Sequence, residues 1–311
     1  MPVSTKNKGV IMKSIENLNS TGTKSRSVKG IITSVATREG AGFAVRRPFP
    51  THTLSYVDPF LLLDHMEPVT LAPGAAKGAP DHPHRGFETV TYMLEGHFVH
   101  RDSAGNSGII GPGDVQWMTA GQGVIHSEMP DDELLENGGR LHGFQIWVNL
   151  PAKEKLIAPR YQDISTNLIP TAESEDGKIW VKVIAGQSMG KNAVIDTRTP
   201  IMFLHAKLKP GAKLVQAIPY QFNAFAYVVE GNGCFGEESL AGNSDQLVLF
   251  ENDGQTVSIE TKDDQELSVL ILGGLPLNEP VARYGPFVMN TQSEIVQALQ
   301  DYQSGRMGAI Q

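Results

Sequence analysis

Cysteine is nearly absent from this sequence. Its 311 residues include one thiol, that of Cys234, which cannot form an internal disulfide. A disulfide-stabilised domain is therefore excluded, and so is a metal site built from thiolates. No apolar run reaches the ~18–20 residues that a membrane-spanning helix needs, and no signal-peptide core is present. These absences lead us to expect a cytoplasmic protein, or a nuclear one if the source is eukaryotic, that does not bind membranes.

Basic residues are also in the minority. Lys and Arg number 26 against 34 Asp and Glu, so the formal net charge is −8. A surface of this sign repels phosphate backbones, and direct nucleic-acid binding is not expected. Residues 1–27 differ, because they are basic and rich in Ser and Thr, with Glu16 as their single acid. We expect a flexible extension there; a transit peptide is the alternative interpretation, and Met12 is an alternative start.

Glycine and proline are abundant. The 32 glycines and 19 prolines divide the chain into short apolar runs, a pattern typical of all-β proteins with many turns. The runs predict a hairpin-like pair of strands at 30–45 and single strands at 60–64, 89–94 and 140–151, and the pattern resumes at Trp180. Loops are expected at 71–80 and 131–139.

Only the end of the chain has helical spacing. The segment SEIVQALQDYQ at 293–303 predicts a short helix with Ser293 as its N-cap. Its expected apolar face consists of Ile295, Val296, Leu299 and Tyr302.

The two halves of the sequence resemble each other. TYMLEGHF at 91–98 is similar to AYVVEGNG at 226–233, and 113–128 can be aligned with 244–260. Repetition over such a long period predicts two similar β domains made by duplication. The predicted division is a first domain at 28–151, a linker at 152–179, a second domain at 180–292, and a helix with a tail at 293–311.

Two pairs of polar side chains indicate a metal site. His82 and His84 are two residues apart, and His126 and Glu128 repeat this spacing. Residues i and i+2 of an extended chain lie on one face. The four side chains can therefore converge if the two segments lie side by side.

The second half of the chain lacks these imidazoles. Ala217 matches His82, Pro219 matches His84, and VSIE replaces VIHSE. If the histidines were only structural, we would see no reason for one copy to hold all of them. The duplication therefore favours a functional site in the first copy alone.

Imidazole and carboxylate ligands suit Fe, Mn, Co, Ni, Cu or Zn. This set also leaves coordination positions open for a substrate or O₂. Glu88 is an alternative fourth ligand, because it lies four residues after His84 and shares its face. Trp117, Met118 and Trp147 are predicted to be core residues and not a substrate cage. The unpaired histidines are predicted to be structural or surface residues: His52, His65, His97, His100, His142 and His205.

Four motifs carry a resemblance to a known family. DHPHRGFETVTYMLEG, GDVQWMTAGQGVIHSEMP, LHGFQIWVNLP and GPFVMNT closely resemble the pirin family of the cupin superfamily. The likeness implies an all-β fold of two cupin (jelly-roll) β-barrels in one chain, with a short C-terminal helix. It also implies one metal in the N-terminal barrel, usually iron and expected as Fe(2+). Thr119 departs from the broad cupin pattern, which commonly has proline there. The metal ligands implied by motif are His82, His84, His126 and Glu128, which favours Glu128 over Glu88.

The resemblance implies two functions. Some pirins look like quercetin 2,3-dioxygenases, which open a flavonol with O₂ and release carbon monoxide; Glu128 would then be the catalytic base. Others resemble redox-sensing regulators, either transcriptional co-regulators or modulators of a metabolic enzyme, whose iron state controls binding of a regulatory protein partner. A third possibility is a barrel that binds a small phenolic ligand without chemistry. We favour the enzyme.

Overall fold

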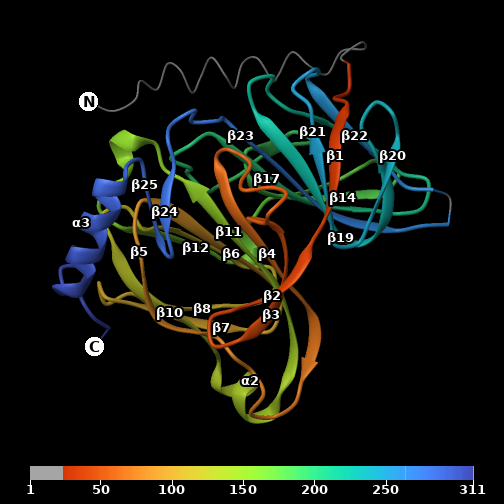
Figure 1. Ribbon diagram of the computed structural model, residues 1–311. Coiled ribbons are helices and arrows are strands. Elements are labelled where there is room, and N and C mark those ends of the chain that lie inside the picture. The colour runs from red at the N-terminus through yellow and green to blue at the C-terminus, as the bar shows by residue number, and fades with distance from the viewer. Residues whose placement is uncertain (1–23, 263, 311) are drawn as a thin grey trace. The chain divides into compact units, whose positions relative to one another are not determined.

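The computed structural model describes residues 24–262 and 264–310 (Figure 1). These residues form two compact units, each built from two stretches of the chain. Unit 1 contains the described part of 1–33 together with 170–276, and unit 2 contains 34–169 and 277–310. Both units consist mainly of strands, which confirms the predicted all-β fold with two barrels and a short C-terminal helix. The extension predicted at 1–27 lies mostly outside the described residues.

The units divide the chain differently from the predicted boundaries of 28–151, 152–179, 180–292 and 293–311. Residues 28–33 pair with a strand of unit 1, and residues 160–164, within the expected linker, pair with a strand of unit 2. The chain after Pro276 returns to unit 2. All three differences arise from contacts between segments far apart in sequence, which a local pattern does not encode.

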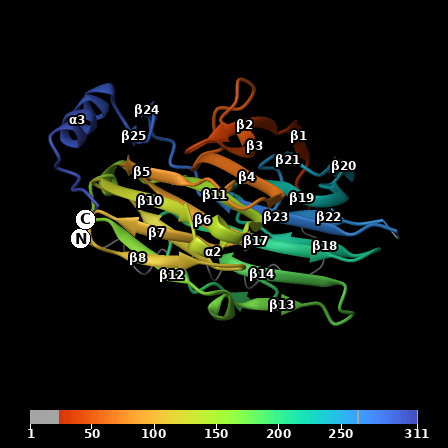
Figure 2. The same ribbon diagram turned by 90° about the horizontal axis from the view of Figure 1, so that it is seen from below.

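Two antiparallel sheets make up most of unit 2. The larger has the order β12-β9-β6-β11-β4-β3-β2, and the smaller has the order β5-β10-β7-β8. The four strands of the smaller sheet can be followed side by side in Figure 2. The strands are β2 Val35–Glu39, β3 Phe43–Phe49, β4 Phe60–Leu71, β5 Ala79–His84, β6 Phe87–Glu95, β7 Phe98–Asp102, β8 Ser107–Ile110, β9 Val115–Thr119, β10 Val124–Pro130, β11 Gly139–Asn149 and β12 Arg160–Ile164.

The central strands of unit 2 follow directly from their sequences. In β6, seven consecutive residues are buried, because the strand has neighbours on both edges and is covered on both faces. In β11, half-buried Gln145 and Trp147 alternate with buried Phe144, Ile146 and Val148. Side chains of a strand alternate between two faces, so Gln145 and Trp147 lie on one face together.

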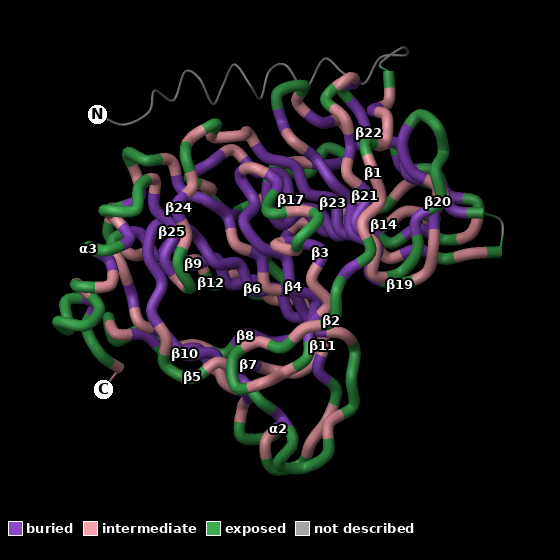
Figure 3. The backbone as a smooth tube through the Cα atoms, viewed as in Figure 1, coloured by how far each residue is buried: buried purple, intermediate pink, exposed green. Residues whose placement is uncertain are grey.

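Unit 1 contains a ten-stranded sheet whose main path is β1-β21-β19-β23-β17-β14-β13. Its central strands β17 and β23 are buried along almost their whole length, as the purple tube in Figure 3 shows. The strands of unit 1, of which β15 and β16 form a separate two-stranded sheet, are β1 Val28–Thr33, β13 Thr171–Glu173, β14 Ile179–Ala185, β15 Gln187–Ser188, β16 Lys191–Asn192, β17 Ile201–Leu208, β18 Lys213–Ala217, β19 Asn223–Phe235, β20 Leu240–Asn243, β21 Gln246–Phe250, β22 Thr256–Glu260 and β23 Leu267–Gly274.

Several local predictions were wrong. The predicted hairpin at 30–45 is split, since β1 joins unit 1 while β2 and β3 form a hairpin in unit 2. The predicted loop at 131–139 contains a short helix, α2 (Asp132–Asn137), which Asp131 caps. Two 3₁₀ turns, Ala152–Glu154 and Thr166–Leu168, lie in the expected linker.

The C-terminal segment forms a short hairpin followed by a helix. Strands β24 (Ala282–Tyr284) and β25 (Phe287–Met289) precede α3 (Gln292–Gln303). Asp301 of α3 binds the guanidinium of Arg85 at 2.7 Å. Arg85 directly follows His84 in the sequence. Within the described residues, neither α2 nor α3 has the length and hydropathy of a membrane-spanning helix.

The N-cap of helix α3 lies two residues earlier than predicted. Thr291, not Ser293, is the N-cap: its Oγ1 accepts from the Glu294 backbone N–H, and the Glu294 carboxylate accepts from the Thr291 backbone N–H. This reciprocal pair is a capping box. Ile295 is buried as predicted, whereas Val296 is 53% exposed and Tyr302 is 40% exposed. Ala298 completes the buried face.

Replacing Thr291 with alanine should therefore destabilise the α3 segment. We expect a loss of about 1 kcal/mol, the usual cost of removing an N-cap hydroxyl. Ser293→Ala is the matched control and should change stability by much less. Thermal unfolding of both variants measures the difference, and equal effects would show that Thr291 is not the functional cap.

Candidate metal centre

The pairing of β5 with β10 brings the two predicted ligand pairs together. In this antiparallel register His126 lies directly opposite His82, and Val124 lies opposite His84. The sequence analysis required that the two segments lie side by side, and the structure places them so. The ligand atoms of His82, His84 and His126 all lie within 4.8 Å of one another.

The spacing of the three imidazoles fits a transition metal. His82 Nε2 and His84 Nε2 are 3.0 Å apart. Two nitrogens at ~2.1 Å from one ion and at right angles to each other would be about 3.0 Å apart. The ring centroid of His126 lies 4.3 Å from that of His82 and 4.9 Å from that of His84. The three imidazoles are therefore spaced as ligands in neighbouring coordination positions of a single ion would be.

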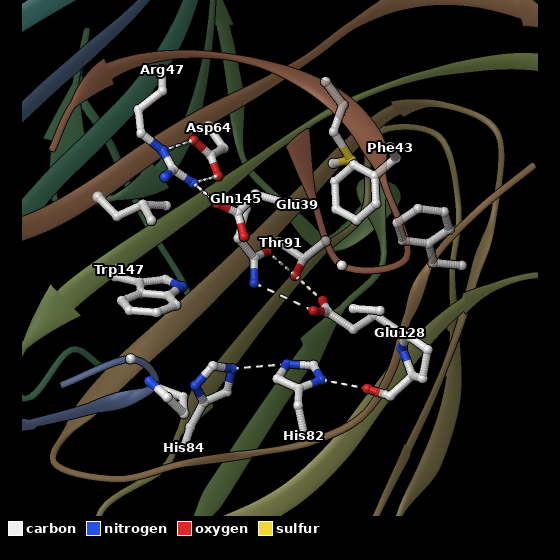
Figure 4. Close-up of a pocket in the computed structure, with 18 of the residues that line it drawn as sticks. Glu39, Phe43, Arg47, Asp64, His82, His84, Thr91, Glu128, Gln145 and Trp147 are labelled. Atoms are coloured by element: carbon white, nitrogen blue, oxygen red, sulfur yellow. Dashed lines mark hydrogen bonds and ion pairs between the residues drawn. The ribbon is translucent and has the colours of Figure 1, made fainter. Parts of the chain in front are cut away.

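The tautomer of His82 is set by the backbone. Its Nδ1 lies 2.7 Å from the Pro80 carbonyl oxygen, which can only accept a hydrogen bond. Nδ1 must therefore carry the proton, and Nε2 is left with a free lone pair that points at His84 (Figure 4). A backbone carbonyl on the far nitrogen is a common support for a metal-binding histidine.

His126 is the most informative of the three residues. Its side chain is fully buried, and neither ring nitrogen has a hydrogen-bond partner among the described residues. A buried polar atom without a partner costs roughly 1–3 kcal/mol, so folded proteins rarely keep two on one ring. A metal ion would satisfy one of these nitrogens, and His126 therefore fits a ligand better than a structural residue.

Burial also keeps His84 and His126 neutral. It is the main reason that the pKa values of these two residues lie well below the ordinary value, and the neighbouring imidazoles lower both further. Neutral imidazole is the form that binds metals. Neither His84 nor His126 therefore has to release a proton before it binds a cation at neutral pH.

Glu128 lies on the same strand as His126, but a β-bulge separates the two residues. Its carboxylate lines the cavity that contains His82 and His84. Glu128 Oε1 lies 2.6 Å from the Thr91 hydroxyl, and Oε2 lies 3.4 Å from Gln145 Nε2 (Figure 4). The compact group within 4.8 Å consists of the three imidazoles alone among the described residues. Glu128 lies outside this group, and its carboxylate is held by hydrogen bonds from Thr91 and Gln145.

The rival ligand Glu88 has a different environment. Its side chain is fully buried, and its Oε1 accepts a hydrogen bond of 2.6 Å from Thr119. Glu88 does not belong to the described residues that line the cavity. Glu128 thus lies in the cavity that His82 and His84 line, whereas Glu88 is buried beside Thr119.

A cavity of about 570 Å³ opens onto the histidines. Small-molecule sites usually measure ~300–1,000 Å³, so the space suits an organic ligand. Its polar end holds His82, His84, Glu128, Thr91 and Gln145, and its apolar wall includes Phe43, Leu62, Met66 and Phe98. Charged side chains line another part of the cavity, those of Glu39, Arg47, Asp64 and Arg283. Polar groups combined with an apolar wall suit an aromatic molecule that carries oxygen substituents.

Trp147 corrects one prediction. Trp117 and Met118 are buried core residues as predicted, but Trp147 is only partly buried and lines the cavity. Its ring contacts the His84 ring edge-on, with 5.3 Å between the ring centroids, and packs against the Phe87 ring, with 4.4 Å between the centroids. Trp147 therefore contributes both to the support of a candidate ligand and to the cavity wall.

The C-terminal hairpin supplies another part of the wall. Arg283, Gly285 and Pro286 line the cavity, although they follow Glu128 by more than 150 residues in the printed sequence. The hairpin approaches the β5–β6 turn so closely that a Cβ on Gly86 would lie 2.0 Å from the Val288 carbonyl oxygen. Gly86 also has φ +88°, so glycine is required at this position.

Two family models match the chain. The Pirin model matches residues 42–148, and the Pirin C-terminal cupin domain matches residues 203–308. A pirin-like protein of Solanum lycopersicum is 49% identical, over 88% of this chain and 90% of its own length. Pirin of Homo sapiens is 42% identical, over 91% of this chain and 95% of its own length. This chain belongs to the pirin family.

Solved structures extend the comparison of this pirin. A quercetin 2,3-dioxygenase from Acinetobacter baumannii is 34% identical, with a TM-score of 0.86, over 93% of this chain and all of that protein. The close curated relatives carry only the name pirin or pirin-like. The likeness therefore shows a shared fold and family, and the activity of this pirin has to be argued from its own site.

Sequence reasoning missed three residues at the site of this pirin. Thr91 and Gln145 contact Glu128, and both could have been found from strand alternation, since they are polar residues within apolar strands. His100 lies opposite Glu128 on β7, and its ring is 5.4 Å from that of His126. Burial is the main cause that lowers the pKa of His100. No signal in the sequence separated His100 from the other unpaired histidines.

Proposed function

We propose that this pirin is a metal-dependent dioxygenase, with iron as the metal, that opens a flavonol such as quercetin with O₂ and releases carbon monoxide. The observation that carries the proposal is the cluster of three imidazoles, those of His84 and His126 buried and neutral, beside a carboxylate in a cavity that Phe43 and Phe98 help to line. The similarity to a quercetin 2,3-dioxygenase at 34% identity supports it.

The residues that would hold the metal are His82, His84, His126 and Glu128. Nitrogen and oxygen ligands of this kind accept Fe(2+), and they also accept Mn, Co, Ni, Cu or Zn. Bound iron would act as a Lewis acid toward the 3-hydroxyl of the flavonol and as the redox partner of O₂. The protein side chains would accept the proton of the substrate, bind its aromatic rings and exclude water.

Glu128 is the residue we assign to proton transfer. A carboxylate in the cavity can accept the proton of the flavonol 3-hydroxyl as a general base. The Thr91 hydroxyl at 2.6 Å holds Oε1 in place, and Gln145 at 3.4 Å lies beside Oε2. Among the described residues this long contact is the only hydrogen bond of Oε2, so Oε2 is the oxygen available to the metal and the substrate.

The apolar wall has two tasks. Phe43, Leu62, Met66 and Phe98 offer a surface for flat aromatic rings, whose burial is favourable by about 25 cal/mol per Å². The same side chains exclude water from the polar end once a ligand fills the cavity. Exclusion of water strengthens the electrostatic interactions there and protects the reacting carbon from hydrolysis.

The direct test is aerobic turnover of quercetin by the iron-loaded protein, with carbon monoxide as the measured product. We expect Glu128→Gln to lower kcat by about 100-fold or more, the usual contribution of a general base. Metal content of the variant should be measured in parallel to separate loss of the base from loss of the ion.

Glu95→Gln is the matched control for this experiment. Glu95 is a carboxylate on β6, in the larger sheet of unit 2, and it pairs at the surface with Arg140. Its replacement should leave turnover unchanged. Failure of the wild-type protein to turn over quercetin with Fe, Mn, Co, Ni or Cu would remove the proposed function.

A further inference from the structure

One arginine of the cavity wall forms no ion pair with another described residue. Arg283 lies on β24 between buried Ala282 and exposed Tyr284, and it lines the cavity. Ala282 packs in the apolar cluster with α3, so the alternation of the strand directs Arg283 away from that cluster. The sequence analysis gave this residue no role.

The contacts of Arg283 leave most of its donors unused. Among the described residues its one hydrogen bond runs from Nη1 to the Leu61 carbonyl at 3.4 Å, which is long and weak. Its Cζ lies over the Trp147 ring at 4.7 Å from the centroid. A guanidinium carries five N–H donors, and no carboxylate of the described chain forms an ion pair with this one. Burial, and then the charge of Arg47, lower the pKa of Arg283, and the charges of Glu39 and Asp64 act in the opposite direction without forming an ion pair with it.

The second arginine of the cavity is in the opposite situation. Arg47 Nε and Nη2 bind the two carboxylate oxygens of Asp64 at 2.6 and 2.5 Å, and Nη2 also contacts Glu39. Glu39 and Asp64, the two carboxylates that act on Arg283, are therefore already bound by Arg47. A partly buried cation without a partner is unfavourable, and a ligand anion can supply the missing partner.

We propose that Arg283 binds an ionised oxygen of the aromatic substrate, either a phenolate or a carboxylate, at the part of the molecule away from the metal-binding hydroxyl. The inference rests on the proposed function, because that function fixes the hydroxyl at the histidines. Trp147 contacts both residues: its ring centroid lies 5.3 Å from that of His84 and 4.7 Å from Cζ of Arg283. An aromatic ligand beside Trp147 can therefore meet the histidines with one edge and Arg283 with another.

The chemistry of arginine favours such an anion. Hydrogen bonds from guanidinium to a charged oxygen are about twice as strong as neutral ones, and a carboxylate can accept two of them. The fixed planar donors select by geometry as well as by charge. Arg283 would thus act as a specificity-determining residue that distinguishes ionised from unsubstituted flavonols.

The test measures equilibrium binding by quenching of tryptophan fluorescence, with iron-loaded protein under anaerobic conditions so that no turnover occurs. Three ligands are compared: 3-hydroxyflavone, 3,7-dihydroxyflavone at a pH where its 7-hydroxyl is ionised, and a 3-hydroxyflavone with a carboxylate on its phenyl ring. We expect Arg283→Gln to reduce the preference for the ionised ligands over 3-hydroxyflavone by about 10- to 100-fold, which corresponds to one charge-assisted hydrogen bond. Arg283→Lys, which keeps the charge but not the planar fork, should give an intermediate preference. The two ionised ligands show whether phenolate or carboxylate is the better match.

Tyr284→Ala is the control on the same hairpin, because Tyr284 is 62% exposed and is not among the residues lining the cavity. Its ligand preference should equal that of the wild type. An unchanged preference in Arg283→Gln would overturn the inference; if that variant does not fold, an unchanged preference in Arg283→Lys together with one in Arg283→Met would do the same. If the protein turns over quercetin in air but its ligand preference does not depend on Arg283, only the inference about Arg283 is contradicted. If the preference depends on Arg283 but no turnover occurs, only the dioxygenase function is contradicted. If none of the three ligands binds, both proposals are contradicted.

Discussion

Replacement of His126 by alanine should abolish metal binding and, with it, turnover. His126 supplies one of three imidazoles in a cluster whose ligand atoms lie within 4.8 Å of one another. We expect iron content to fall from about one ion per chain to nearly none, because a preformed site has to present its whole ligand set. Loss of the Lewis acid should cost several kcal/mol of barrier, or about 10³-fold or more in kcat. Metal analysis and quercetin turnover of the purified variant measure both effects.

Two further measurements separate a ligand from a structural residue. His100→Gln removes the imidazole next to His126 and should retain iron, since His100 is outside the compact cluster. For the metal-free proteins, His126→Ala should change the free energy of unfolding by less than about 1 kcal/mol, because relief of two unpartnered nitrogens offsets the cavity created. Full iron content in His126→Ala would contradict the assignment.

The second barrel shows why such a small stability effect is reasonable. In unit 1, β18 and β22 pair in an antiparallel register, with Ala217 opposite Thr256, much as β5 and β10 pair in unit 2. The duplicated segment therefore keeps its strand pairing with Ala217 in place of a histidine, and Pro219 follows the end of the strand. A cavity of about 190 Å³ lies at these two residues. The fold does not need the imidazoles, which supports a functional reason for those of the first copy.

The central part of the candidate site could be predicted because it is encoded locally. Two residues spaced i, i+2 on a strand share a face whatever else the chain does, and this rule placed His82 with His84. The same rule was less accurate for His126 and Glu128, because a bulge between them shifts the register. A bulge adds one residue to a strand, and the sequence VIHSEMP contains no glycine that would indicate it.

The rest of the site depends on contacts that no local pattern contains. Arg283 reaches the cavity only because residues 277–310 return to unit 2, whereas the sequence analysis attached 180–292 to the second domain. Trp147 was assigned to the core from its apolar character alone. Its neighbour Gln145 carried the missing information, since a polar residue two positions away on one strand indicates that their common face meets a polar space.

Lys155 should make one of the largest single contributions to the stability of unit 2. Its side chain is 1% exposed, and Nζ donates to the Gly86 carbonyl, Asn149 Oδ1 and the Val288 carbonyl at 2.7–3.0 Å. Lys155→Met keeps most of the volume but removes the ammonium group that donates to all three buried acceptors. We expect a loss of about 3–5 kcal/mol in the free energy of unfolding, measured by urea denaturation. Turnover should fall as well, because Gly86 lies two residues from His84.

The pH dependence of this effect has a definite sign. Burial lowers the pKa of Lys155 from 10.5 to about 8 in the folded protein. Between these values the unfolded chain binds more protons than the folded one, so the group's contribution to stability increases as pH rises from about 8 to 10.5. The difference between wild type and Lys155→Met should therefore widen over this range. Lys153→Met, an exposed change in the same turn, is the control and should show neither the loss nor the pH trend. A constant or shrinking difference would mean that the Lys155 amine is not buried as a cation among these three acceptors.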